Sequence, residues 1–254
     1  MIGLFSDEMS KLNLEFVEMG VNVSEQIYRA TKSYIDHDKK LAQQVIDGDE
    51  KINEEETELE NRALQIMALK QPLAKDFRLI ISALKASSDL ERIGDHAATI
   101  ARETIEVKGN ERVPEIEELL GEMTNKVRSM METVLDAYSK DNADTAKEAA
   151  QMDLEVDVLY YKAHKLIVGV MERQTDTAVA NASYLNVARL LERIGDHIVN
   201  LAEWVIYRQS AKLVELNPGK IDRHIVQKEA DGLIDEKEAM KKVGRKLDKK
   251  LDEN

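Results

Sequence analysis

The sequence predicts an all-α protein made of two tandem three-helix bundles, followed by a charged C-terminal extension. Only 3 of the 254 residues are proline and 4% are aromatic, while the abundance of Glu, Lys, Ala and Leu favours helices. Apolar residues recur at helical spacing through long stretches of the chain. Seven residues at 90–96, Leu-Glu-Arg-Ile-Gly-Asp-His, return unchanged at 191–197, and such a repeat favours two similar halves.

The first half contains three predicted helices. Apolar positions at helical spacing predict the first helix over residues 6–34. The periodicity breaks around residues 36–38, and a second helix runs to about residue 69. Pro72 ends this helix, because the residue before a proline avoids the helical region. The third helix begins near residue 74, carries the first copy of the repeat, and ends between residues 105 and 109.

The second half repeats this plan. After a short polar link at residues 110–113, Pro114 can occupy the first turn of a fourth helix that reaches about residue 139. Asp141 or Asn142 can cap the fifth helix, which runs to about residue 173. A polar turn at residues 174–177 leads into the sixth helix, which carries the second copy of the repeat and ends between residues 207 and 210.

These elements divide the chain into residues 1–112, 113–216 and 217–254. The last part opens with a helix-breaking Asn-Pro-Gly and has few apolar positions. It contains 10 Lys and Arg residues against 9 Asp and Glu residues, so it is nearly neutral and the two halves together carry a net charge of 26 − 40 = −14. This composition predicts a mobile amphipathic helix or a linker.

Each copy of the repeat carries two carboxylates four residues apart, Glu91 with Asp95 and Glu192 with Asp196. Residues four apart share one face of a helix and lie about 6 Å apart along its axis, so their oxygens can hold a cation. Placing residues at 100° each puts these acids roughly 160° to 180° from the apolar stripe. We therefore expect them to face away from the main core.

A second pair of oxygen donors lies in the preceding helix of each half. Asp49 and Asn53 align with Asp153 and Asp157 after a shift of 104 residues. They lie roughly 80° to 110° from the apolar stripe, on the flank. Antiparallel neighbouring helices could join both pairs of a half into a four-ligand oxygen site, although Asn53 in place of an acid weakens the first one. A solvated acidic face is the alternative interpretation.

Gly94 and Gly195 occupy equivalent positions in the two copies. A glycine inside a helix costs about 1 kcal/mol relative to alanine. Its presence can allow a neighbouring helix to approach closely.

Composition excludes several functional classes. The chain has no cysteine, so disulfides and thiolate chemistry are excluded and a metal must be held by oxygen or imidazole; oxygen ligands suit magnesium, manganese, calcium or iron. No apolar run reaches the roughly 18 residues of a membrane span and the N-terminus lacks a signal-peptide pattern, so we expect an intracellular soluble protein. The net charge of −13 disfavours nucleic acid as a direct ligand.

The residues at 71–79 (Gln-Pro-Leu-Ala-Lys-Asp-Phe-Arg-Leu), 83–96 and 187–197 resemble the PhoU family, accessory regulators of the phosphate-specific ABC transporter. The resemblance covers residues 1–216. It implies two three-helix bundles related by pseudo-twofold symmetry and metal clusters, of iron, zinc, manganese or magnesium, on the bundle surface. The positions that match the family's metal-binding motifs are Asp153, Asp157, Glu192, Asp196, Glu91 and Asp95, with Asp49 paired to Asn53 where the family has an acid.

The resemblance also implies a function. A PhoU-like protein would dampen phosphate uptake and phosphate-starvation signalling as an adaptor rather than an enzyme. Its partners would be the transporter's ATPase subunit and a sensor histidine kinase, and it would form a homodimer. It would be cytoplasmic, peripheral at the inner face of the membrane through the transporter.

Two other functions remain open from the residues. A carboxylate-bridged di-metal oxidoreductase uses Glu-x-x-His pairs directed into a bundle core, whereas His96 and His197 follow Glu91 and Glu192 by five residues, roughly 140° around the helix. We expect His197 to be a hydrogen-bonded packing residue instead. A metal-free helical scaffold would use the acids only to meet Lys and Arg of a partner protein.

Overall fold

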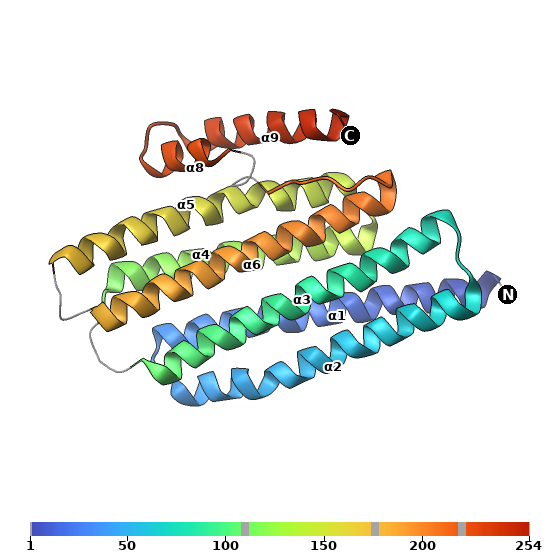
Figure 1. The fold of residues 1–254 in the computed structure, drawn as a ribbon, viewed down its shortest axis with the longest axis horizontal. Helices are drawn as coiled ribbons and strands as arrows, with labels where there is room; N and C mark the ends of the chain where they lie inside the picture. Colours follow the sequence, from blue (N-terminus) through green and yellow to red (C-terminus); the bar gives the residue numbers. More distant parts are fainter. Residues whose placement is uncertain (1, 108–111, 174–177, 218–221, 254) are drawn as a thin grey trace.

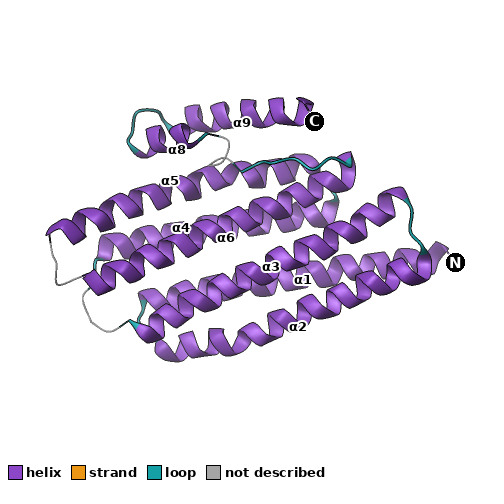
Figure 2. Cartoon of the chain, in the orientation of Figure 1, coloured by secondary structure: helices purple, strands orange, loops and turns teal. Residues whose placement is uncertain are grey.

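A computed structural model describes residues 2–107, 112–173, 178–217 and 222–253. Within these ranges it consists of helices joined by short loops, without a strand (Figure 2). The helices of the two halves and the extension are α1 (Ile2–Ile35), α2 (Lys39–Lys70), α3 (Ala74–Glu106), α4 (Pro114–Lys140), α5 (Ala143–Arg173), α6 (Ala178–Ser210), α8 (Arg223–Ala230) and α9 (Glu236–Glu253). The predicted all-α class and the order of the six long helices are confirmed.

The ends of the helices follow the sequence signals. The Asp38 side chain accepts hydrogen bonds from the first backbone N–H groups of α2, and Gln71 ends that helix in a left-handed conformation (φ 47°) just before Pro72. Pro114 is the first residue of α4. The Asn142 side chain caps α5 by accepting from two backbone N–H groups. The predicted turn at residues 174–177, the Pro218-Gly219 break and the first half of the link at 110–113 lie outside the described residues.

The two halves form two three-helix bundles that lie against each other. Helices α1, α2 and α3 pack together, as do α4, α5 and α6, and α3 lies beside α6 in the centre of the molecule (Figure 1). Helix α1 also packs against α4. Both halves contribute to one continuous hydrophobic core.

The halves can be aligned residue by residue through their cores. A shift of 104 residues places buried α1 side chains on buried α4 side chains, and the 101-residue shift does the same for α3 and α6. The fully buried pairs include Leu12 with Ile116, Phe16 with Leu120, Val23 with Val127, Leu90 with Leu191, and Ile93 with Ile194. Sites that lie at equivalent positions of the two halves can therefore be compared residue by residue.

Aromatic and polar contacts fasten the halves to each other. The Phe16 ring of α1 stacks on the Tyr138 ring of α4 with centroids 3.9 Å apart. The buried Arg208 guanidinium lies 4.4 Å above the Tyr138 ring and donates to the Tyr138 carbonyl at 3.0 Å. The Tyr34 hydroxyl donates to Ser183 Oγ at 2.8 Å. The Phe16–Tyr138 and Tyr34–Ser183 contacts join α1 of the first half to α4 and α6 of the second, and the Arg208 contacts join α6 to α4 within the second half.

The C-terminal extension lies on the second half. From Ala211 the chain turns back along α5 and α6, and α8 and α9 then pack against α5 (Figure 1). Val214 and Leu216 are buried. One face of α9 is buried through Ala239, Val243 and Leu247, so the expected amphipathic helix is present in this segment. Its expected mobility stays a prediction.

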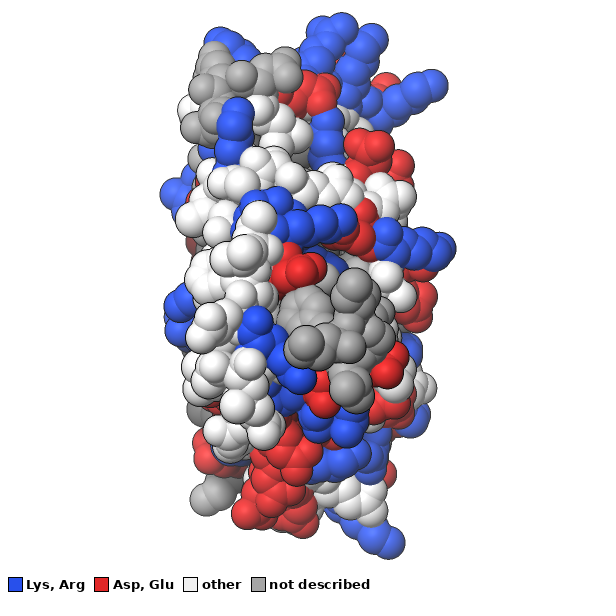
Figure 3. All heavy atoms as spheres, turned by 90° about the vertical axis from the view of Figure 1, so that its right-hand side faces the viewer, with Lys and Arg blue, Asp and Glu red and all other residues white. Residues whose placement is uncertain are grey.

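The described helices include none with the length and apolar character that a membrane crossing requires. The right-hand end of the molecule as drawn in Figure 1 carries basic and acidic side chains side by side with uncharged ones (Figure 3). On this end of the molecule the negative net charge is therefore not gathered into one acidic surface.

Candidate metal sites

The second acidic site lies in the seam between α5 and α6. Asp153 of α5 is only 1% exposed. It points at Gly195 of α6, where a Cβ atom would collide with Asp153 Oδ1. The glycine of the second repeat therefore makes room for a buried carboxylate from the neighbouring helix, which is the close approach that the sequence predicts.

The other three predicted ligands lie in the same seam between α5 and α6. Asp157, Glu192 and Asp196 are half-buried. Burial, with the nearby charges of Glu192 and Asp196, raises the pKa of Asp157 to about 7. Asp157 Oδ2 is buried without a hydrogen-bond partner among the described residues. The structure thus brings Asp153, Asp157, Glu192 and Asp196 into one strongly negative cluster.

A residue of the extension enters the same cluster. The Asn217 side-chain amide is 2% exposed and donates to Asp153 Oδ2 at 3.3 Å and to Asp196 Oδ1. The charge of Arg223, at the start of α8, also acts on Asp157 and lowers its pKa. Neither residue could be recognised from the sequence, because Asn217 belongs to the helix-breaking Asn-Pro-Gly and Arg223 follows it in the charged extension.

The first acidic site occupies the equivalent seam between α2 and α3. Asp49 is 7% exposed and accepts a hydrogen bond from Gln26 Nε2 of α1 at 3.3 Å. The Arg102 guanidinium of α3 lies 3.9 Å from its other oxygen. A Cβ atom on Gly94 would lie 3.2 Å from the Ile52 side chain and 3.7 Å from Asp49 Oδ1. The approach of the two helices is similar but less tight.

The remaining donors of the first site are more open to solvent. Asp95 and Asn53 are exposed. Burial, with the nearby charges of Asp95 and Glu56, raises the pKa of Glu91, and burial together with Asp95 raises that of Asp49. Asp49, Glu91 and Asp95 therefore lie within electrostatic reach of one another. Asn53 adds no charge to this group.

The helical-wheel prediction of outward-facing acids holds only in part. Asp95 is exposed as expected, but Glu91, Glu192 and Asp196 are half-buried. The wheel places a residue relative to its own helix, whereas α2 and α5 cover part of the outer face of α3 and α6. Asp49 and Asp153, expected on a flank, are buried by the same packing.

The histidines of the two repeats meet each other rather than the acids. The His96 and His197 rings have centroids 5.5 Å apart, and His197 Nδ1 lies 2.9 Å from Asp89 Oδ1. Burial, followed by the charges of His197 and Arg193, lowers the pKa of His96 to about 4. His197 is thus the hydrogen-bonded packing residue that we expected, and the Glu-x-x-His arrangement of a di-metal oxidoreductase is not formed by these residues.

The donor set of the second site fits a small divalent cation. All four predicted ligands are carboxylates, one of their buried oxygens lacks a partner, and Gly195 leaves the space that Asp153 fills. Magnesium, manganese and calcium prefer such oxygen ligands. Within the described ranges no three His, Asp or Glu side chains already have the geometry of a metal cage. In the second site the Asn217 amide lies between two of the carboxylates.

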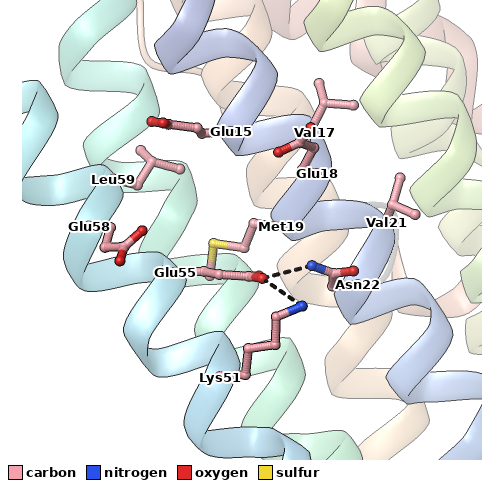
Figure 4. A pocket seen from close by; sticks show the side chains of 10 residues that line it. All are labelled: Glu15, Val17, Glu18, Met19, Val21, Asn22, Lys51, Glu55, Glu58 and Leu59. Carbon is pink, nitrogen blue, oxygen red and sulfur yellow. Dashed lines mark hydrogen bonds and ion pairs between the residues drawn. The ribbon is translucent and has the colours of Figure 1, made fainter.

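A groove between α1 and α2 also carries acids, and two of them, Glu15 and Glu55, are paired. Its volume is about 500 Å³, and its lining includes the side chains drawn in Figure 4. Glu55 accepts from Asn22 at 2.8 Å and lies 3.3 Å from Lys51 Nζ, while Glu15 pairs with Arg62. The groove therefore differs from the second acidic site, where carboxylates converge on one another.

Comparisons with known proteins agree with this architecture. The profile of the PhoU domain matches residues 16–104 and again residues 120–205. Similar proteins are the phosphate-specific transport system accessory protein PhoU homologs of Clostridium acetobutylicum, 34% identical over 84% of this chain and 98% of that protein, and of Pseudomonas putida, 37% identical over 80% of this chain and 79% of that protein.

Two crystal structures share the fold. The phosphate transport system regulatory protein PhoU from Streptococcus pneumoniae matches with a TM-score of 0.78 and 33% identity, covering 83% of this chain and 99% of that one. PhoU from Pseudomonas aeruginosa matches with a TM-score of 0.78 and 36% identity, covering 82% of this chain and all (100%) of that one. From the two profile matches and these relatives, the chain belongs to the PhoU family.

Proposed function

We propose that this chain is an accessory regulator of inorganic phosphate uptake that restrains uptake and phosphate-starvation signalling. The observation that carries the proposal is the double match to the PhoU domain, together with the similarity to phosphate-specific transport system accessory protein PhoU homologs. The chain would act as an adaptor on the ATPase subunit of a phosphate ABC transporter and on a sensor histidine kinase. These partners would hold it at the cytoplasmic face of the membrane, and we expect it to be a homodimer.

We also propose that the acidic sites hold cations, most tightly in the second half. Asp153, Asp157, Glu192 and Asp196 would be the ligands there, and Asp49, Glu91, Asp95 and Asn53 in the first half. Iron, zinc, manganese and magnesium are the candidates. A bound cation supplies positive charge to an acidic surface, which could then attract phosphate or a partner's carboxylate.

The role in phosphate uptake is tested in cells. Uptake of labelled phosphate is measured in phosphate-replete medium in the native host, in a strain lacking this chain, and in the same strain with the chain restored. We expect uptake and a phosphate-starvation reporter to rise without the chain and to return to the native level when it is restored. Unchanged uptake and reporter activity in the deletion strain would reject the proposal.

The contribution of the cations is tested with the same strain. Restoration with the Asp153→Ala/Asp196→Ala variant should fail to lower uptake, whereas a variant of an exposed histidine, His164→Ala, should restore it fully. Co-purification with the ATPase subunit then shows whether adaptor binding is lost. If the double variant restores uptake as well as the native chain does, the cation of the second site is not needed for regulation.

A further inference from the structure

The segment between α6 and α8 is anchored directly beside the second acidic site. Leu216 is fully buried, and Val214 is nearly so. The Leu216 backbone N–H donates to Glu203 Oε1 of α6 at 2.8 Å. Because Asn217 follows Leu216 directly, its backbone position is set by these anchors. The fold therefore places the Asn217 side chain in the second acidic site.

The Asn217 amide occupies the position between carboxylates of two different helices. Its NH₂ group donates to Asp153 of α5 and to Asp196 of α6. An amide NH₂ carries partial positive charge and can only donate. The NH₂ group of Asn217 therefore lies between two carboxylates, at a position to which their negative charge would also attract a cation.

The first half satisfies its buried aspartate in another way. Asp49 has the Gln26 amide of α1 and the Arg102 guanidinium of α3 beside it. The aligned positions in the second half are Met130, which is fully buried, and Glu203. A methionine cannot donate a hydrogen bond, and a glutamate has the opposite charge to arginine. At these two aligned positions the second half therefore has no group equivalent to Gln26 or Arg102, and its Glu203 anchors the extension.

We propose that Asn217 is an additional cation ligand of the second site, contributed by the C-terminal extension. This inference rests on the proposed cation sites. Rotation about the last side-chain bond exchanges the NH₂ group and the carbonyl oxygen of the amide, so the oxygen can face a divalent cation while the backbone remains anchored. Magnesium, manganese and calcium accept asparagine carbonyl oxygens beside carboxylates.

Manganese titration of the full chain tests the ligand. All variants are made in a background protein that carries Asp49→Ala and Asp95→Ala. These two substitutions disable the first site, so that manganese binding reports the second site alone. Adding Asn217→Ala is expected to weaken manganese binding about 10- to 100-fold. Adding Asn217→Asp keeps an oxygen donor at the same atom and is expected to bind manganese at least as tightly as the background.

The extension offers a matched control. Gln227 of α8 donates to the Tyr161 hydroxyl of α5 at 3.3 Å and is an exposed amide on the same segment. Gln227→Ala should therefore leave manganese affinity unchanged. Tighter binding by Asn217→Ala would mean that the amide competes with the cation, and equal binding would mean that it is not a ligand. Either result, or weaker binding by Asn217→Asp, would overturn the inference.

The two proposals fail in different ways. If the background binds no manganese, or still binds it after Asp153→Ala and Asp196→Ala are added, the proposed cation site is rejected and Asn217 with it. If those two substitutions abolish binding while Asn217→Ala does not weaken it, only the role of Asn217 is rejected. Far-ultraviolet circular dichroism of each variant checks that the helices are retained.

Discussion

The two acidic sites have the same seven-residue repeat but different surroundings. In the first site, Asp49 has Gln26 and Arg102 as partners, and Asp95 is open to solvent. In the second, Asp153 is fully buried, Asp157 has an unpartnered buried oxygen, and the extension enters through Asn217. The repeat fixes where the carboxylates stand. Neighbouring residues outside the repeat decide how strongly each site attracts a cation.

This difference predicts that the second site binds cations more tightly. Like charges that are close together and partly withdrawn from water raise each other's pKa, and a cation relieves that repulsion. The first site has less to gain, because Arg102 already supplies positive charge and exposed acids are screened by solvent. Variants at aligned positions can separate these effects.

The largest expected effect on manganese affinity is that of Gly195→Ala, which is compared with Gly94→Ala at the aligned position. Gly195→Ala places a Cβ atom against Asp153 Oδ1, so the carboxylate must turn away and second-site manganese affinity should fall by about 10-fold or more. Gly94→Ala meets Ile52 at 3.2 Å, which a small side-chain shift can accommodate. Calorimetric titration of both variants should show a loss at the second site only; equal losses at both sites would contradict the different packing.

A smaller effect is expected from Asp157 in chelator-treated protein. Its pKa of about 7 lies above its ordinary value of 3.8, so ionisation disfavours the folded state, and the stability present at low pH is lost as the pH rises towards 7. The uncharged side chain of Asp157→Asn removes this loss of stability. Its thermal midpoint should exceed that of the native chain by about 2 °C or more at pH 8, with a smaller difference at pH 5.

The matched control for this prediction is Asp95→Asn in the first site. Because Asp95 is exposed, its substitution should change the free energy of unfolding by no more than about 0.5 kcal/mol. An advantage of Asp157→Asn that does not grow between pH 5 and pH 8 would show that the carboxylate is not held in a repulsive cluster.

The smallest effect concerns Arg102. Its guanidinium is partly exposed and lies 3.9 Å from Asp49 Oδ2, a pair that contributes at most about 1 kcal/mol. Arg102→Ala should therefore strengthen manganese binding at the first site by about two- to fivefold, measured with Asp153→Ala/Asp196→Ala disabling the second. Weaker binding would mean that Arg102 organises the site instead of competing with the cation.

The sequence predicted the fold well because its signals are local. Helical periodicity, Pro72, Pro114 and the Asn142 cap each mark a boundary that the structure contains. The acid pairs and the two glycines could also be recognised in the sequence, because they recur at equivalent positions of an internal repeat. That the pairs would come together followed from antiparallel neighbouring helices.

The neighbours that distinguish the two sites could not be predicted. Asn217 contacts Asp153 across 64 positions of sequence and belongs to a segment whose composition indicates a linker. Gln26 and Arg102 resemble ordinary polar residues on helix surfaces. Their importance depends on which helices pack together, and a helical wheel contains no information on the neighbouring helix.

The most direct test of the cation sites is elemental analysis of untagged chain purified without chelator and again after reconstitution. The native chain is compared with Asp153→Ala/Asp196→Ala and with the aligned Asp49→Ala/Asp95→Ala. We predict that metal stays bound in the native chain and in the first-site variant, and that the second-site variant loses most of it. Equal metal content in the two variants, or no metal in the native chain after reconstitution, would contradict a dominant cation site between α5 and α6.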